Sequence, residues 1–403
     1  MKKKILILSL AYYPNHVSGA EVAIKEVTDR FSPEDYEFHM VTLRYNSNVA
    51  KTEQVGNVCV HRIGITRKDP TFEDLGKMPL HINKPLFQFA AAWEALRLHL
   101  KYKFDGIWAL MAHSSGVPAA IFKMCNPKVP FVLTLQEGDP PEQIEKTMKP
   151  LWPFFSRAFT KADVVQAVST FLGDWALRRG FTGPLEIIPN GASISTDTEY
   201  DQAELDALAR EVGKKEGEFV MVSVSRLVHQ KAIDMNIKAV ALLPENVRYV
   251  VVGDGPDMES LKALAQEEGV ADRVVFMGRV DRSMTSKYRK IADVFVLPSR
   301  SEGLGISFLS TMAAGLPMVA TQQGGIKDFL FDAQRNPDKP TTGWAVDIDS
   351  PEQIASAVQD IMEHPEQVER VLQNTKKMVE EQYNWETIAA NMETKIFAKV
   401  LPE

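Results

Sequence analysis

The amino-acid sequence predicts an α/β protein built from two doubly wound domains, each with a parallel sheet covered by helices on both faces. Three observations favour this fold class. The chain has 403 residues, whereas single cores rarely grow past about 250–300 residues. Apolar strands alternate with amphipathic helices along the whole chain. A strand–loop–helix opening also occurs twice, about 220 residues apart.

The first half begins with the strand "KKILILSL", the turn-rich loop "YYPNHVSGAE" and the helix "EVAIKEVTDRF". Further strands are expected at "GIWALM", "PFVLTL" and "DVVQAVS". These runs are continuously apolar rather than alternating, which is typical of parallel strands buried on both faces.

The second half repeats the pattern with the strand "EFVMVSVSRL", the loop "VHQKA" and the helix "IDMNIKAVALLP". Strands follow at "VRYVVVG", "RVVFMG", "DVFVLP" and "PMVAT". The segment "IIPNGASISTDTEYD" is rich in Pro, Asn, Gly and Ser, which suits a linker between the halves. The tail, "WETIAANMETKIFAKVL", is expected to form one more helix.

Composition excludes several classes of protein. The net charge of −7 argues against a nucleic-acid binder, which would carry a basic surplus. The only two cysteines, Cys59 and Cys125, provide neither a disulfide framework nor a zinc-type spacing, which fits a reducing compartment. The start "MKKKILIL" favours a buried strand over a short signal peptide, and no apolar stretch approaches about 18 residues. We therefore expect a cytoplasmic protein.

The loops that follow strands are where ligands bind in open α/β sheets. In the loop "SVSRLVHQKA", Arg226 and Lys231 lie between a strand and a helix. A helix N-terminus already favours anions, so two cations there indicate a diphosphate site. The alternative for such a pair is a solvated surface position.

Two further loops give weaker evidence of a ligand-binding site. Gly253, in "VVVGDGP", would let a ligand approach the backbone closely, although a plain tight turn explains it equally well. Arg279 and Val280 follow the strand that ends at Gly278 and would form an edge for a nucleobase. A strand end followed by a turn is the alternative interpretation.

The stretch "SEGLGISFLSTMAAGLP" is the fourth loop. Glu302 precedes two glycines, Gly303 and Gly305, and the pattern predicts a helix over residues 304–314 that ends at Gly315. A position eight residues beyond Glu302 lies about 12 Å further along a helix. That length matches the span from a hexose across a diphosphate to a ribose.

Taken together, these loops resemble the retaining family-four glycosyltransferases, which have the GT-B fold. The resemblance covers essentially the whole chain, including "SRLVHQKA", "VVGDGP", "FMGRV", "ADVFVLPSRSEGLG" and "AAGLPMVATQQGGIKDFL". It implies two Rossmann-like domains facing across a cleft. Residues 1–189 would form the acceptor-side domain, joined by a returning helix at residues 385–403, and residues 190–384 would bind a nucleotide sugar.

The resemblance also implies roles for individual residues. Arg226 and Lys231 would hold the donor diphosphate and neutralise charge as the sugar leaves, and Glu302 would bond the donor sugar. The other implied donor-binding residues are Gly19, Gly253, Arg279, Val280, Gly303, Leu304, Gly305, Ile306 and Ser310. The family mechanism needs no protein nucleophile, no cofactor and no metal.

Three positions depart from the family pattern. Ser310 stands where the family has a second Glu, and Ala20 and Ala232 stand where glycines are usual. A carboxylate accepts from both ribose hydroxyls, whereas a serine hydroxyl accepts less. We expect this change to weaken donor binding by about 1.5–3 kcal/mol without abolishing it.

The sequence gives less evidence about the acceptor site than about the donor site. His113 aligns loosely with a donor-facing histidine of the family, and a loop histidine without a role is the alternative. Glu137 and Asp139 either bind acceptor hydroxyls or form a turn or helix cap. The stretches "KTMKPLWPFFSRAFTK" and "FQFAAAWEALRLHLKYK" either contact an anionic membrane or, as we expect, pack into the core. The "DID" at 347–349 resembles a metal-binding pattern but is expected to be solvated.

The sequence therefore predicts a retaining, metal-independent hexosyltransferase that uses a UDP- or GDP-linked sugar. Its acceptor would be a carbohydrate, a lipid-linked sugar or a small molecule, with peripheral contact to the inner face of the membrane left open. A sugar-nucleotide epimerase or hydrolase on the same fold, and a non-catalytic homologue with weakened donor binding, are the alternatives.

Overall fold

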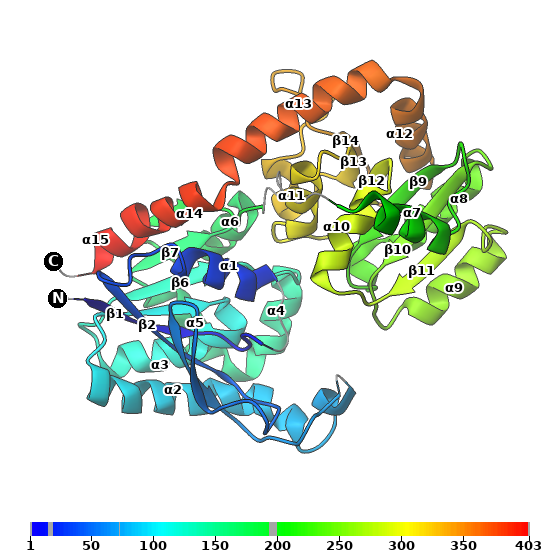
Figure 1. The fold of residues 1–403 in the computed structure, drawn as a ribbon. Helices are drawn as coiled ribbons and strands as arrows, with labels where there is room; N and C mark the ends of the chain where they lie inside the picture. The colour runs from blue at the N-terminus through cyan, green and yellow to red at the C-terminus, as the bar shows by residue number, and fades with distance from the viewer. Residues whose placement is uncertain (1, 15–18, 72, 193–199, 402–403) are drawn as a thin grey trace. The chain divides into compact units, whose positions relative to one another are not determined.

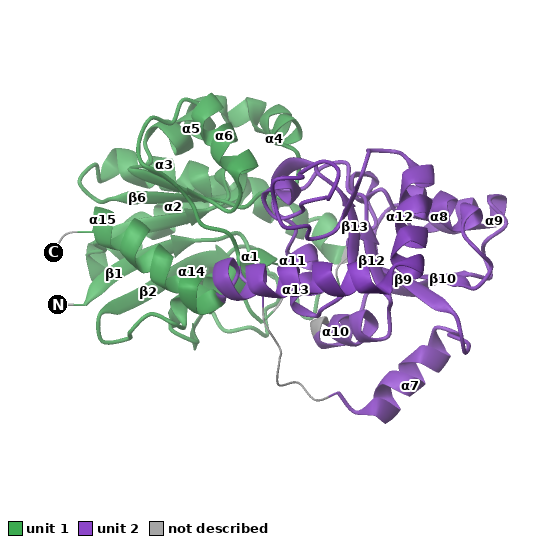
Figure 2. Ribbon diagram, turned by 90° about the horizontal axis from the view of Figure 1, so that it is seen from above, with its two compact units in different colours: residues 1–190, 385–403 green, residues 191–384 purple. Residues whose placement is uncertain are grey.

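The computed structural model describes residues 2–14, 19–71, 73–192 and 200–401. The chain divides into two compact units (Figure 2). Unit 1 comprises residues 1–190 and 385–403, and unit 2 comprises residues 191–384. Each unit contains its own sheet and its own helices, so each is described separately.

Unit 1 is built on an eight-stranded sheet with the order β3-β4-β2-β1-β5-β6-β7-β8. All neighbouring strands are parallel except β3 and β4, which are antiparallel. The central strands β1 and β5 are almost entirely buried, as their unbroken apolar sequences predict. The strands are β1 (Lys3–Leu8), β2 (Tyr36–Leu43), β3 (Thr52–Val55), β4 (Val58–Ile63), β5 (Gly106–Leu110), β6 (Phe131–Leu135), β7 (Val164–Ala167) and β8 (Leu185–Ile187).

Helices cover both faces of this sheet (Figure 1). The C-terminal segment packs into the core of unit 1, where Trp385, Met392 and Phe397 join side chains of α1 and the central strands. This segment continues from α14 through a π-helical turn, residues 392–397, into α15. The helices of unit 1 are α1 (Gly19–Thr28), α2 (Asn83–Tyr102), α3 (Val117–Cys125), α4 (Pro141–Met148), α5 (Trp152–Thr160), α6 (Thr170–Arg178), α14 (Trp385–Asn391) and α15 (Ala398–Val400).

Unit 2 is built on a six-stranded, wholly parallel sheet with the order β11-β10-β9-β12-β13-β14. Its strands are β9 (Phe219–Val224), β10 (Val247–Val252), β11 (Val274–Gly278), β12 (Val294–Leu297), β13 (Met318–Thr321) and β14 (Trp344–Val346). Its helices are α7 (Gln202–Glu211), α8 (Ile233–Leu242), α9 (Met258–Glu267), α10 (Arg282–Lys290), α11 (Ile306–Ala313), α12 (Pro351–Glu363) and α13 (Pro365–Gln382).

Both sheets reverse their winding direction at one place. In unit 2 the reversal lies between β9 and β12, and in unit 1 it lies between β1 and β5. In a doubly wound sheet the loops that leave the carboxyl ends of these two strands diverge and leave room for a ligand. The topology therefore selects the loops after β9 and β12, and after β1 and β5, as the places where chemistry is expected.

Two details differ from the sequence-based expectations. Helix α11 runs from Ile306 to Ala313 rather than over residues 304–314, because Gly305 has a φ of 87° and cannot continue the helix. The stripe on α2 was expected to pack into the core, but Trp93 and Leu100 are 72% and 73% exposed, while Phe87 is buried. Within the described ranges, no helix has the length and apolar character needed to cross a bilayer.

Candidate active site

Lys231 and Glu302 form a buried ion pair at the winding reversal of unit 2. Lys231 ends a short 3₁₀ turn, His229–Lys231, between β9 and α8, and Glu302 lies in the loop between β12 and α11. Lys231 Nζ donates a hydrogen bond to Glu302 Oε2, and the two side chains are only 11% and 8% exposed. The structure thus brings together a predicted phosphate-binding cation and a predicted sugar-binding carboxylate.

The backbone of Glu302 is held by the glycine pair after β13. Gly325 N donates to Glu302 O over 3.0 Å. Gly324 has a φ of 58°, and a Cβ added there would lie 1.9 Å from Glu302 O, so no side chain fits. The Glu302 carboxylate also accepts from Ser299 Oγ at 3.4 Å. No role was predicted for this glycine pair from the sequence, where it is only part of a longer motif.

Arg300 connects the two loops on either side of the ion pair. Its guanidinium donates to both carboxylate oxygens of Asp234, at 2.7 and 3.1 Å, and to His229 O at 2.6 Å. It also donates to Asp349 Oδ1 at 2.6 Å. Burial lowers the pKa of Arg300, but the hydrogen bonds and charges of Asp234 and Asp349 outweigh burial and raise it. Arg300 therefore keeps its charge and fixes the loop of Lys231 against the loop of Glu302.

Arg300 could not be predicted as a site residue, because its partners lie 49 to 71 residues away along the chain. The "DID" acids were expected to be solvated. They are exposed, at 61% for Asp347 and 52% for Asp349, and both form ion pairs with arginines.

Arg226 lies two residues after β9 and is exposed, unlike Lys231. Its loop is held against the loop after β10, where Leu227 N donates to Asp254 O at 2.9 Å. A Cβ on Gly253 would lie 1.8 Å from Ser225 O, and the φ of Gly253 is 144°. The glycine thus allows close packing between two loops of the protein.

The remaining donor-loop residues of unit 2 lie at β11 and α11. Arg279 and Val280 directly follow β11, with Arg279 exposed and Val280 half-buried. Gly303 and Leu304 are buried, whereas Gly305, Ile306 and Ser310 are half-buried. Ser307 Oγ donates to Val224 O at 2.8 Å, which anchors the first turn of α11 to the end of β9.

In unit 1, the loop after β5 brings His113 beside Glu137. Ala112 N donates to Glu137 Oε1 over 2.5 Å, and His113 Nδ1 lies 3.7 Å from the same oxygen. Glu137 has a fully buried side chain, whereas that of His113 is 33% exposed. Within the described residues, Glu137 Oε2 and His113 Nδ1 are buried without a hydrogen-bond partner. Such unsatisfied buried atoms cost free energy and are rare in native proteins, and a functional role is one explanation for them.

The backbone leading to His113 is itself unusual. Met111 has a φ of 65°, and residues 112–116 form a π-helical turn. Such features concentrate at functional sites. Asp139 is half-buried in the next loop. Gly19 begins α1 and is half-buried, while the preceding loop residues 15–18 lie outside the described residues.

Two family models match the chain, one for each half. The model described as "Glycosyltransferase Family 4" matches residues 17–196, and the model described as "Glycosyl transferases group 1" matches residues 206–378. The models together extend over both predicted domains.

Curated relatives include a GDP-mannose-dependent alpha-(1-6)-phosphatidylinositol monomannoside mannosyltransferase of Mycobacterium tuberculosis, 32% identical over 241 residues. This match spans 57% of the chain but only 60% of the mycobacterial protein. An alpha-monoglucosyldiacylglycerol synthase of Streptococcus pneumoniae is 36% identical over 151 residues, which are 36% of the chain and 34% of that protein.

Several solved structures have a fold similar to that of this chain over almost its full length. The sucrose-phosphate synthase of Thermosynechococcus elongatus has a TM-score of 0.79 at 20% identity, covering 99% of the chain and all of that structure. The HepE protein of Anabaena, in complex with UDP and glucose, has a TM-score of 0.75 at 19% identity and covers 98% of the chain and all of that structure. These likenesses confirm the expected GT-B fold class.

Proposed function

We propose that this chain, which belongs to the family-four glycosyltransferases, transfers a hexosyl group from a nucleotide diphosphate sugar to an acceptor hydroxyl with retention of anomeric configuration. The observation that carries the proposal is the buried Lys231–Glu302 pair at the winding reversal of unit 2. An ammonium group and a carboxylate, next to the start of α11, offer one partner for phosphate and one for sugar hydroxyls.

Lys231 can serve both partners at once. An ammonium group has three donors, so Lys231 can keep one hydrogen bond to Glu302 and direct another at a diphosphate oxygen. Glu302 has a second oxygen, Oε1, with which it can accept from a sugar hydroxyl. Arg226, on the exposed part of the same loop, adds a second cation for the diphosphate. Arg279 and Val280 would frame the base.

The reaction then needs little covalent help from the protein. The bond between the anomeric carbon and the diphosphate oxygen breaks, and the acceptor oxygen forms the new bond on the same face of the sugar. The acceptor proton passes to a phosphate oxygen of the leaving diphosphate. Lys231 and Arg226 stabilise the negative charge that develops there, which is where preorganised charges contribute most.

The names of the relatives support a UDP- or GDP-linked donor. The mycobacterial relative is named as dependent on GDP-mannose, and the HepE structure holds UDP and glucose. One of these relatives is also named for a glycolipid acceptor, phosphatidylinositol monomannoside, and another is named for a glycolipid product, monoglucosyldiacylglycerol. We therefore propose a lipid-linked acceptor, with a free carbohydrate or a small molecule as alternatives.

We further propose that unit 1 touches the membrane through an exposed face of α2. Leu86, Phe89, Trp93 and Leu100 are 48–73% exposed. Their spacing of three, four and seven residues places them along one side of the helix. The exposed cations Lys84, Arg97 and Lys101 lie on the same helix, so that the helix combines apolar and basic groups as interfacial helices do.

The His113–Glu137 pair favours one second candidate, a sugar-nucleotide epimerase or hydrolase, because such an enzyme needs an acid and a histidine near the sugar. In a transferase, the same pair would instead hold the His113 ring in a fixed orientation. The reaction products distinguish the two activities: an epimerised or hydrolysed sugar on one side, a glycosylated acceptor on the other.

Calorimetric titration with UDP-, GDP-, ADP- and TDP-linked hexoses tests the proposed function. We expect one of these donors to bind, because the diphosphate loop carries both of its cations. If none binds, the chain is a non-catalytic homologue. A donor that binds and is hydrolysed or epimerised in the presence of glycolipid and sugar acceptors, without transfer, would favour the second candidate.

A further inference from the structure

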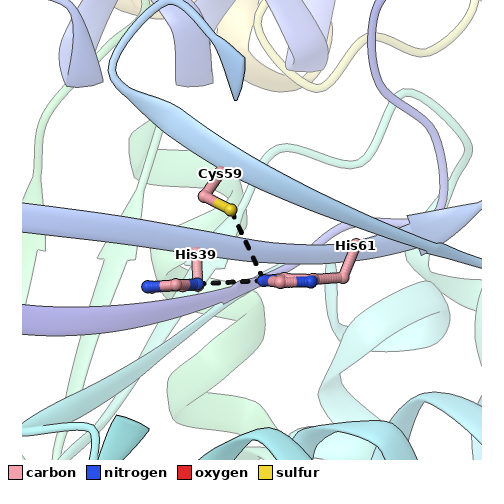
Figure 3. Close-up of side chains that lie close together, drawn as sticks. All are labelled: His39, Cys59 and His61. Carbon is pink, nitrogen blue, oxygen red and sulfur yellow. Dashed lines mark hydrogen bonds between the residues drawn. The ribbon is translucent and has the colours of Figure 1, made fainter. Parts of the chain in front are cut away.

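Three metal-ligating side chains converge in unit 1, away from the winding reversal. His39 lies on β2, and Cys59 and His61 lie on β4 (Figure 3). His39 pairs with Cys59 across the parallel strands, and His61 is two residues further along β4, so all three side chains point to one face of the sheet. His39 Nδ1, Cys59 Sγ and His61 Nε2 lie within 4.8 Å of one another.

The cluster is enclosed by protein. His39 and His61 are 3% and 6% exposed, and Cys59 is half-buried. The ring of Tyr102, at the end of α2, lies 4.2 Å from that of His39 between centroids, and Phe104 lies 5.3 Å away. The opposite face of β2 and β4 carries the apolar core residues Phe38 and Val60. Polar groups on a covered sheet face cost free energy unless each finds a partner.

Glu37 fixes the tautomer of His39. Its Oε1 accepts from His39 Nε2 at 2.7 Å, which leaves Nδ1 with a lone pair directed into the cluster. A carboxylate on the far nitrogen of a histidine is the arrangement that orients metal-ligating imidazoles in proteins.

We propose that His39, Cys59 and His61 bind one zinc-type divalent cation, with Glu37 as the outer partner of His39. Two imidazole nitrogens and one thiolate are the donor set that borderline-soft cations such as Zn²⁺ select. Three protein ligands leave the fourth position of a tetrahedral ion for water. The proposal is independent of the proposed transferase activity, whose donor loops belong to unit 2.

The distances fit such an ion after a small movement. Around a tetrahedral Zn²⁺, ligand lengths of about 2.0–2.1 Å for N and 2.3 Å for S separate two nitrogens by about 3.3 Å, and sulfur from nitrogen by about 3.5 Å. Cys59 Sγ and His61 Nε2 are 3.7 Å apart. The two nitrogens are 2.9 Å apart, joined by a hydrogen bond between nearly coplanar rings. The rings must therefore part slightly and tilt toward Cys59.

Without metal, His39 Nδ1 accepts the hydrogen bond from His61 Nε2–H, because the proton of the His39 ring lies on Nε2, which donates to Glu37. On binding, the proton on His61 Nε2 moves to His61 Nδ1, and both ring nitrogens turn their lone pairs to the ion. The Cys59 thiol loses its proton to solvent, because only the thiolate is a ligand.

Cobalt(II) provides a spectroscopic test, because it substitutes for zinc and absorbs through its thiolate bond. The full chain, stripped with a chelator, is titrated with Co²⁺. We expect a thiolate-to-cobalt charge-transfer band and tetrahedral d–d bands that saturate at one equivalent, and Zn²⁺ should remove them. Cys125 offers a matched control, since it is the second cysteine and is exposed.

The variant Cys125→Ala should keep both bands, whereas Cys59→Ala should lose the charge-transfer band. His61→Gln should weaken Co²⁺ binding at least tenfold, and a thermal unfolding scan in chelator verifies that each variant folds. Zn²⁺ should raise the melting temperature of the wild type and of Cys125→Ala by more than that of Cys59→Ala or His61→Gln. Absence of the bands in a folded wild type, or their survival in Cys59→Ala, would overturn the proposal and leave a hydrogen-bonded histidine pair.

Discussion

The side chains of Lys231 and Glu302 each compensate the buried charge of the other. Both side chains are about nine-tenths buried, and removing one partner of a buried pair leaves an uncompensated charge that costs about 3–5 kcal/mol. The pair therefore restrains the two loops before a donor arrives. Their chemical types could be read from the sequence, but their contact could not, since it depends on how β9 and β12 become neighbours in the sheet.

Ser310 lies on α11 at the position where the family resemblance leads us to expect a second Glu. The variant Ser310→Glu adds a carboxylate on α11, eight positions beyond Glu302. If the ribose lies there, donor binding should tighten by about 10- to 100-fold, which corresponds to the 1.5–3 kcal/mol of a hydrogen bond to a charged group. Calorimetric titration with the donor that binds the wild type measures the change.

The control for this prediction is Ser356→Glu, which adds the same charge at an exposed position of α12. It should leave the dissociation constant unchanged. Weaker donor binding by Ser310→Glu than by the wild type would mean that this end of α11 no longer faces a ribose.

At the scale of elements, strands were predicted well because their signal is local. "VRYVVV" and "KKILIL" are largely apolar runs that are each followed by a turn-rich loop, and they become β10 and β1. Helix ends were less certain, since the start of α11 depends on the positive φ of Gly305. The network of Arg300 with Asp234 and Asp349 was not foreseeable, because it joins the first turn of α8 to two loops that only the folded sheet brings together.

Helix α2 is a second case in which the sequence pattern did not predict which side chains are buried. Its apolar residues were assigned to the core, but they are spread around the helix, so that Phe87 is buried and Trp93 is exposed. The hydrophobic pattern alone does not say which of two apolar faces meets the sheet. The exposed face is the basis of the membrane proposal.

The double variant Phe89→Ser/Trp93→Ser tests that proposal. Each large apolar side chain gains about 1.5–3 kcal/mol on full burial, so the double variant should lose at least about tenfold in affinity for vesicles of anionic phospholipid. Cosedimentation with such vesicles measures the affinity. Leu242→Ser, at a 52% exposed position of α8 in unit 2, is the control and should bind like the wild type. Equal loss in both variants, or no binding by the wild type, contradicts the proposal.

At the scale of the whole molecule, the sequence predicted the two-domain α/β class because the strand–loop–helix pattern occurs in both halves of the chain. The sheets of the two units share the strand order of doubly wound folds, each with one winding reversal. Fold class follows from local patterns and chain length, but the identity of the donor does not. Base and sugar depend on a few side chains whose placement around a ligand is set by tertiary contacts.

The central claim is that Lys231 stabilises the departing diphosphate, and turnover of Lys231→Ala tests it most directly. Release of the nucleoside diphosphate is measured with the donor identified by calorimetry. Lys262→Ala, a lysine 48% exposed on α9, is the control, and thermal unfolding verifies that Lys231→Ala is folded. The account predicts at least about a hundredfold loss of turnover in Lys231→Ala and none in Lys262→Ala. Unchanged turnover in folded Lys231→Ala would contradict it.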